Sequence, residues 1–258
     1  MSFKCERLTK TFHTRSGDVT ALEDITFSAN EHEFICIVGP SGCGKSTLLR
    51  IIADILPASS GKIIANSTNS THNFRSALVF QEHGLFQWMT VLDNVAFGLE
   101  MQGIPKAVRR KKAREFIEQF GLGQFAENYP HELSIGMQQR VGIARAFLTD
   151  PELLLMDEPF GSLDAQTKFV LREELLRIWR EHQKLVIFVT HDVEEAILLG
   201  DRVLVMTGRP GRIREDIRIP LERPRDQNGR DLAKITETKK RIWNMLEEEV
   251  RKNLWISD

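Results

Sequence analysis

The fold is decided by the sequence FICIVGPSGCGKSTLLRII, which runs from Phe34 to Ile52. Its first five residues are apolar and rich in branched side chains, which predicts a short buried strand. Its last residues place leucines and isoleucines at helical spacing, and a glycine-rich turn joins the two parts. The order of strand, glycine-rich loop and buried helix is typical of α/β proteins.

The loop from Gly39 to Ser46 satisfies the pattern G-x-x-x-x-G-K-[ST] in the strand-to-helix context that this pattern requires. Glycines let the backbone wrap around phosphates, and the start of the helix attracts the same anion. We expect Lys45 to reach the β- and γ-phosphates of ATP and the Ser46 hydroxyl to bind Mg²⁺. An incidental lysine in a glycine-rich turn is the alternative, which the flanking elements disfavour. The expected nucleotide contacts are Gly39, Pro40, Ser41, Gly42, Cys43, Gly44, Lys45, Ser46 and Thr47.

Similar apolar runs recur along the chain and predict a largely parallel sheet covered by helices. These runs are Ala77 to Phe80, Leu153 to Met156, Leu185 to Val189 and Val203 to Met206. The stretch from Thr90 to Phe147 has helical periodicity and no convincing strand, so we expect an inserted helical subdomain over about residues 88–148. Residues 208–230 are rich in Gly, Pro and Arg, which predicts turns and an irregular connection.

A helix is expected near the end of the chain, within a C-terminal extension over residues 231–258 that follows the main domain, residues 1–230. One face of this helix should be apolar. Docking on its own domain is favoured over binding a partner. The apolar residues are Ile235, Ile242, Leu246, Val250 and Leu254.

The composition excludes several classes of protein. The chain has 258 residues, with 35 Lys and Arg against 36 Asp and Glu, and 41% are hydrophobic, which argues against disorder and against a generally basic nucleic-acid binder. The basic run Arg109 to Lys112, together with Arg114, is interpreted as a solvated helix face; anionic lipid or nucleic acid is the alternative. No apolar run is long enough to span a membrane, and no secretory signal precedes the first strand, so residence in the cytosol is expected. The three cysteines fit reduced thiols.

A second chemical element follows the apolar run that starts at Leu153. Asp157 and Glu158 come directly after this run, at a strand end where ligands of open α/β sheets bind. We assign Asp157 to Mg²⁺ through water and Glu158 to the attacking water as general base. Alone, such an acidic pair would more often be a surface turn; together with the phosphate loop it becomes the favoured catalytic site.

With these motifs in this order, the chain resembles the ATP-binding subunits of ABC transporters from Leu8 to about Ile213. The resemblance implies an α/β P-loop NTPase fold: a mostly parallel sheet core, an N-terminal antiparallel β subdomain and an inserted α-helical subdomain. By resemblance, Phe12 stacks on adenine and Gln81 contacts Mg²⁺ and the lytic water. His191 matches the switch histidine of the family, which contacts the γ-phosphate.

The resemblance also identifies the family signature over Leu133 to Arg140 and an aspartate loop that ends at Asp164. Ser134 is a natural N-cap and Gly136 permits close approach, so this helix start can bind an anion. In the family that anion is ATP on a second subunit, which implies a homodimer that shares two ATP sites. Ile135 replaces a glycine of the signature, and a β-branched residue is poorly suited to a positive φ or to a tight ligand approach, so less efficient ATPase activity is expected.

The resemblance is strongest to the nitrate, sulfonate and taurine branch of importers. It implies an ATPase at the cytoplasmic face of the cell membrane that docks on integral-membrane permease subunits around Phe86 and Trp88. A solute-binding protein would be an indirect partner, and no nucleic acid is expected. The alternative is a non-transport or regulatory ABC-type protein with weak ATPase activity.

Overall fold

A computed structural model of the chain describes residues 2–65, 74–80, 84–225 and 229–254. The chain divides into two compact units. The first consists of Met1–Phe74 and Lys184–Asp258, and the second of Arg75–Gln183. Each unit is described by itself.

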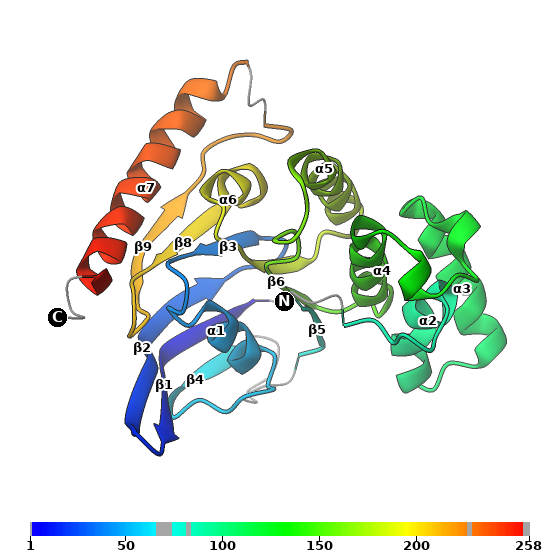
Figure 1. The fold of residues 1–258 in the computed structure, drawn as a ribbon, viewed down its shortest axis with the longest axis horizontal. Helices are drawn as coiled ribbons and strands as arrows, with labels where there is room; N and C mark the ends of the chain where they lie inside the picture. The colour runs from blue at the N-terminus through cyan, green and yellow to red at the C-terminus, as the bar shows by residue number, and fades with distance from the viewer. Residues whose placement is uncertain (1, 66–73, 81–83, 226–228, 255–258) are drawn as a thin grey trace. The chain divides into compact units, whose positions relative to one another are not determined.

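The first unit holds two groups of strands. In one, β1 (Phe3–Thr14) pairs antiparallel with both β2 (Gly17–Ala29) and β4 (Ser60–Ala65). In the other, β3 (Phe34–Val38) lies between and parallel to β7 (Leu185–Val189) and β8 (Arg202–Met206), as the sequence predicts. The helix α1 (Lys45–Ile52) contacts β2 and β7, so it packs between the two groups (Figure 1).

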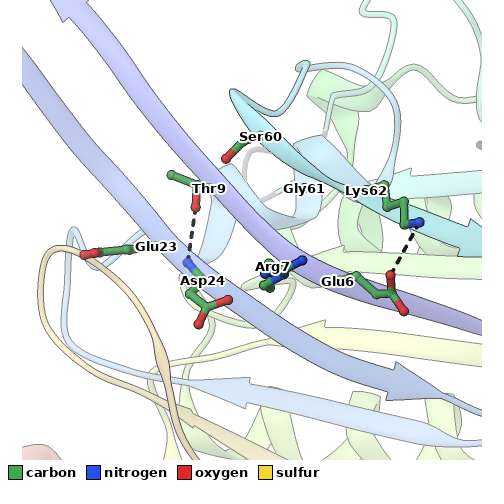
Figure 2. Close-up of a pocket in the computed structure, with 8 residues that line it drawn as sticks. All are labelled: Glu6, Arg7, Thr9, Glu23, Asp24, Ser60, Gly61 and Lys62. Atoms are coloured by element: carbon green, nitrogen blue, oxygen red, sulfur yellow. Dashed lines mark hydrogen bonds and ion pairs between the residues drawn. The ribbon is translucent and has the colours of Figure 1, made fainter.

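Bulges interrupt β1 where it faces both of its neighbours. The pairing shifts between Cys5 and Leu8 against β2 and between Glu6 and Thr9 against β4. A Cβ atom on Gly61 of β4 would lie 2.3 Å from the carbonyl oxygen of Arg7 in β1, so the close approach of the two strands here requires glycine. A polar hollow of about 570 Å³ opens at the bulges (Figure 2). It is lined by Glu6, Arg7, Thr9, Glu23, Asp24, Ser60, Gly61 and Lys62.

One strand lies in a segment where turns were expected. β9 (Ile213–Arg218) pairs antiparallel with β8 and falls within residues 208–230. The prediction of an irregular connection is therefore wrong for these six residues. The sequence IREDIR is mostly charged, so the alternation that marks a half-buried strand is hidden, and pairing with the buried β8 sets its conformation instead.

The C-terminal helix α7 (Leu232–Leu254) docks on its own unit, which was the favoured alternative. It packs against β8 and against α6 (Val193–Leu199), as Figure 1 shows. Ile235 and Ile242 are buried, and Arg214 of β9 forms ion pairs with Glu248 and Glu249 of α7. Apolar contact and peripheral ion pairs together fix this helix.

The second unit contains two parallel strands, β5 (Ser76–Val79) and β6 (Leu153–Asp157). The chain between them is helical, as expected, and α4 contacts β5. Its helices are α2 (Val91–Met101), α3 (Lys106–Gln119) and α4 (Ile135–Leu148), with short 3-10 turns at Gly123–Phe125 and Pro130–Glu132, and α5 (Ala165–His182) follows β6.

The basic run on α3 is largely neutralised by ion pairs within its unit. Arg109 pairs with Glu100, Arg110 with Asp93, and Arg114 with Glu127. A solvated and paired helix face, the favoured interpretation, therefore accounts for these arginines. Among the described residues, no helix is both long and apolar enough to cross a membrane.

We predict that Ile242→Ala lowers the free energy of unfolding by about 2–5 kcal/mol, because it removes a fully buried side chain from the contact between α7 and its unit. Urea unfolding followed by circular dichroism measures the change. The exposed Lys240 provides a matched control on the same helix, and Lys240→Ala should change the free energy by no more than about 0.5 kcal/mol. Equal effects of the two substitutions would mean that α7 is not docked.

Candidate functional site

The phosphate loop has a backbone that only glycine accommodates easily. Gly42 has φ 73° and Gly44 has φ 104°, and α1 begins at the next residue, Lys45. The Lys45 side chain is buried, and its Nζ donates hydrogen bonds to the carbonyl oxygens of Gly39 (2.9 Å) and Pro40 (3.0 Å). The ammonium therefore lies over the loop, where phosphate oxygens would be stronger acceptors than the two carbonyls.

Two further backbone segments support this loop from behind. A Cβ atom on Gly44 would lie 3.0 Å from the carbonyl oxygen of Ala21, and one on Gly211 would lie 2.1 Å from that of Cys43. The Gly211 amide donates to Ala21 at 2.9 Å, and its carbonyl accepts from Glu23 at 3.0 Å. Sequence reasoning missed this role of Gly211, although a glycine in a Gly- and Pro-rich segment was a signal of close packing.

Phe12 lies near the end of β1, opposite Val19 of β2. Its ring is 37% exposed, which leaves surface for stacking on a base. The Lys10 Nζ lies 5.2 Å from the ring centroid and donates to the carbonyl oxygen of Pro57 at 2.7 Å. Phe12 thus has a side-chain contact that helps hold its ring, and its role in adenine binding stays a prediction.

His191 lies at the same sheet edge as the phosphate loop. It follows β7, which pairs parallel with β3, and the Thr190 amide donates to the Ile37 carbonyl oxygen at 3.1 Å. Parallel strands bring their carboxyl ends to one edge, so the exposed His191 lies within the first unit at the edge where the phosphate loop begins, and its contact with the γ-phosphate stays a prediction. Asp192 caps the following helix, accepting from the amides of Glu194 and Glu195.

The two predicted catalytic carboxylates lie at the end of β6 in the second unit. Asp157 is the last residue of this strand and is buried, and Glu158 follows it with φ 46°. A positive φ is strained for glutamate, and such strain is concentrated at functional sites. The Gly161 amide donates to the Glu158 carbonyl oxygen at 3.0 Å and closes the turn.

The signature and the aspartate loop come together within the second unit. Ser134 caps α4, with its Oγ accepting from the Met137 amide at 3.3 Å. A Cβ atom on Gly136 would lie 2.8 Å from the Thr167 methyl group of α5, so glycine permits this packing. Asp164 caps α5, and hydrogen bonds from Thr167 lower the pKa of its carboxyl.

Ile135 is the first residue of α4, and its backbone is helical. Of the two alternatives for this position, a positive φ is therefore wrong, and hindrance to a close ligand stays a prediction. A β-branched side chain is tolerated at the start of a helix because no preceding turn restricts its χ1 angle. The isoleucine side chain is half exposed, and its backbone carries no strain that would argue for weak activity.

A cluster of aromatic side chains in the second unit lies in the loop before α2 and on α2 itself. The Phe86 ring lies 5.3 Å from Trp88 and 4.5 Å from Phe97, centroid to centroid, and Trp88 is 73% exposed. The fully buried Asn94 donates to the carbonyl oxygens of Phe86 (3.0 Å) and Met89 (3.1 Å) and accepts from the Phe86 amide (2.9 Å). Sequence reasoning assigned no role to Asn94, which holds the loop that presents Trp88.

The structure brings the predicted residues together within each unit. In the first are Phe12, the phosphate loop and His191; in the second are the pair Asp157 and Glu158, and the pair of helix starts at Ser134 and Asp164. Gln81 lies outside the described residues. Ser46 and Asp157 offer a hydroxyl and a carboxylate, the hard oxygen donors that Mg²⁺ prefers, so these residues fit the ion.

Comparison with known sequences gives a family and several relatives. The ABC transporter family model matches residues 22–161. An uncharacterized ABC transporter ATP-binding protein of Methanocaldococcus jannaschii is 49% identical over 98% of this chain and 94% of its own length. The taurine import ATP-binding protein TauB of Roseobacter denitrificans is 42% identical over 93% of this chain and 94% of its own length. The aliphatic sulfonates import ATP-binding protein SsuB of Bacillus cereus is 43% identical over 91% of this chain and 93% of its own length.

Comparison with solved structures also finds ATP-binding cassettes. A dimeric ATP-binding cassette in a post-hydrolysis state, bound to ADP and phosphate, matches with a TM-score of 0.75 and 30% identity. The match covers 85% of this chain and 100% of that one. The dimeric structure of a bacterial ABC transporter cassette gives the same TM-score at 31% identity. The expected fold class, an α/β P-loop NTPase with an antiparallel β subdomain, is thereby confirmed.

We predict that the thiols of the native chain resist modification. Cys5, Cys36 and Cys43 are all buried, and burial raises the pKa of Cys5 and Cys36, so little thiolate is present at pH 8. An aromatic disulfide reagent should show no rapid phase with the native chain and should react with all three cysteines in guanidinium. A rapid reaction of one thiol per native chain, mapped to Cys43, would mean that the phosphate loop opens readily.

Proposed function

The chain belongs to the family of ABC transporter ATP-binding proteins, and we propose that it is the ATP-hydrolysing subunit of an importer. Its solute would be nitrate, a sulfonate, taurine or a related small molecule. The observation that carries this proposal is the likeness, along more than 90% of both chains, to ATP-binding proteins named for taurine and aliphatic sulfonate import. Relatives this similar over more than nine-tenths of their length support the same task in energy coupling.

The residues suit the hydrolysis of ATP. The loop amides and Lys45 would bind the phosphates, and Phe12 would stack on the adenine. Ser46, with Asp157 through water, would hold Mg²⁺, which neutralises phosphate charge when bound. Glu158 would take a proton from the attacking water, and Gln81 would help orient that water. His191 would donate a hydrogen bond to the γ-phosphate.

Two copies of the chain would complete each other's sites. The start of α4, capped by Ser134 and closely packed at Gly136, presents backbone amides to an anion. In the proposed dimer this anion is the ATP bound to the phosphate loop of the second copy. The likeness to dimeric ATP-binding cassettes supports this arrangement.

The membrane partners would be permease subunits that bind the cluster of Phe86, Trp88 and Phe97. An exposed tryptophan on a loop that Asn94 holds rigidly is suited to binding an apolar helix of a partner. The chain would then act at the cytoplasmic face of the membrane. A solute-binding protein would contact the permease and not this chain.

We predict that Glu158→Gln lowers ATP turnover at least a hundredfold and leaves ATP affinity within about threefold, because the amide keeps the shape of the side chain but cannot accept the proton. Phosphate release measures turnover, and fluorescent-nucleotide titration measures affinity. Glu173→Gln on the exposed side of α5 is the matched control and should keep full turnover. Unchanged turnover in Glu158→Gln would overturn the assignment and favour a regulatory protein with weak activity.

We predict that Trp88→Ala weakens association with the membrane subunits at least fivefold, because it removes the most exposed ring of the cluster. Permease retained on the purified chain from detergent-solubilised native membranes is the measurement, with ATP affinity as a check on the fold. Met101 is also exposed and apolar in the same unit, so Met101→Ala serves as the control. Equal retention by the two variants would place the permease contact elsewhere.

A further inference from the structure

Besides its buried face, α7 carries a stripe of exposed apolar residues on a side that the rest of the first unit does not cover. This stripe consists of Leu232, Trp243 and Val250. Leu232, Trp243 and Val250 are 49%, 59% and 44% exposed, while Ile235 and Ile242 of the same helix are buried. Residues 232, 243 and 250 follow one another at spacings of 11 and 7, which are about three and two helical turns, so they share one face. Figure 1 shows α7 at the outer flank of β8, β9 and α6.

Trp243 lies at the centre of this helix. The helix runs from Leu232 to Leu254, and residue 243 is its midpoint. A second α7 laid antiparallel with the two Trp243 rings opposed would overlap the first along its whole length. In that register Val250 lies opposite the partner's Thr236, and Lys239 lies opposite the partner's Glu247. The two tryptophans therefore face each other and the charges are complementary, while each valine faces the methyl-bearing side chain of a threonine.

The ion pairs that Lys239 and Glu247 form within one chain do not prevent this antiparallel pairing. Lys239 pairs with Glu194 of α6, and Glu247 accepts from Arg251 at 2.7 Å on its own helix. All four side chains are well exposed, so these pairs are weak and their exchange costs little. Lys239 can also contact Glu194 and the partner's Glu247 together, because an ammonium has three donors.

We propose that α7 is a pairing surface through which two copies of this chain bind each other, antiparallel and centred on Trp243. The stripe of one helix is smaller than the interface of a stable dimer, so this pairing adds to another contact between the same two chains. The shared ATP sites of the proposed dimer would supply that contact. The pairing itself requires only a second copy and no hydrolysis, so it can hold where the proposed catalytic roles fail.

The experiment is site-specific cross-linking of the full chain. In the proposed register residue 236 of one copy lies opposite residue 250 of the other, so a chain with Thr236→Cys and Val250→Cys should form a covalent dimer on mild oxidation while both Trp243 rings remain. Lys234→Cys with Lys252→Cys is the matched control, because both positions are exposed on the same helix but lie two and a half turns from Trp243 and therefore on the opposite side. The unaltered chain gives the background, because its described cysteines are buried.

We expect the chain with cysteines at 236 and 250 to cross-link at least tenfold faster than the chain with cysteines at 234 and 252, with and without magnesium and ATP. Equal rates for the two variants in both conditions would overturn the pairing. Thermal unfolding of each variant confirms that it is folded, and none of the four substitutions removes a buried side chain. ATP turnover of the same preparations reports on the proposed function separately.

Charge reversal tests the register. In the chain with Thr236→Cys and Val250→Cys, either Lys239→Glu or Glu247→Lys should slow cross-linking three- to tenfold, because each places two pairs of like charges across the symmetric contact. The two reversals together should restore the original rate. Glu194→Gln is the control for the existing pair of Lys239 and should leave the rate unchanged. Failure of the double reversal to restore cross-linking would refute the antiparallel register.

Discussion

The first unit depends on the left-handed backbone of Gly44, one residue before α1 begins. This conformation turns the chain from β3 into a helix so tightly that the loop amides and Lys45 face one region. The tightness has to be supported, and Ala21 and Gly211 supply the support by backbone contact with Gly44 and Cys43. The packed strands and helices of this unit hold that turn in place.

The parallel order of β7, β3 and β8 provides the second constraint, because it brings each strand's carboxyl end to one edge. A loop that binds phosphate and a histidine 150 residues later can then lie together without any local sequence signal linking them. The second unit repeats the principle at β6, whose end presents Asp157 and a strained Glu158. Strand direction thus determines which polar residues can take part in chemistry.

The sequence predicted those elements whose signal is local. The strands β3 and β7 have the expected bounds because each is a buried run of five apolar residues. The strand β9 was missed because its pairing partner, and not its charged sequence, determines it. The positive φ considered for Ile135 was wrong because helix geometry sets that backbone. The supporting roles of Gly211 and Asn94 arise only from tertiary contact, and the chemical roles of the site residues stay predictions.

Both units expose a tryptophan on a rigid support, and this has a common physical reason. Buried Asn94 holds the loop of Trp88, and buried Ile242 docks the helix beside Trp243. A large ring that is already held in place loses little conformational entropy on binding, so its apolar area is available as affinity. A nearly neutral chain attracts partners weakly by net charge. Specific assembly with a permease and with a second copy would then depend on such fixed rings, with local ion pairs setting the register.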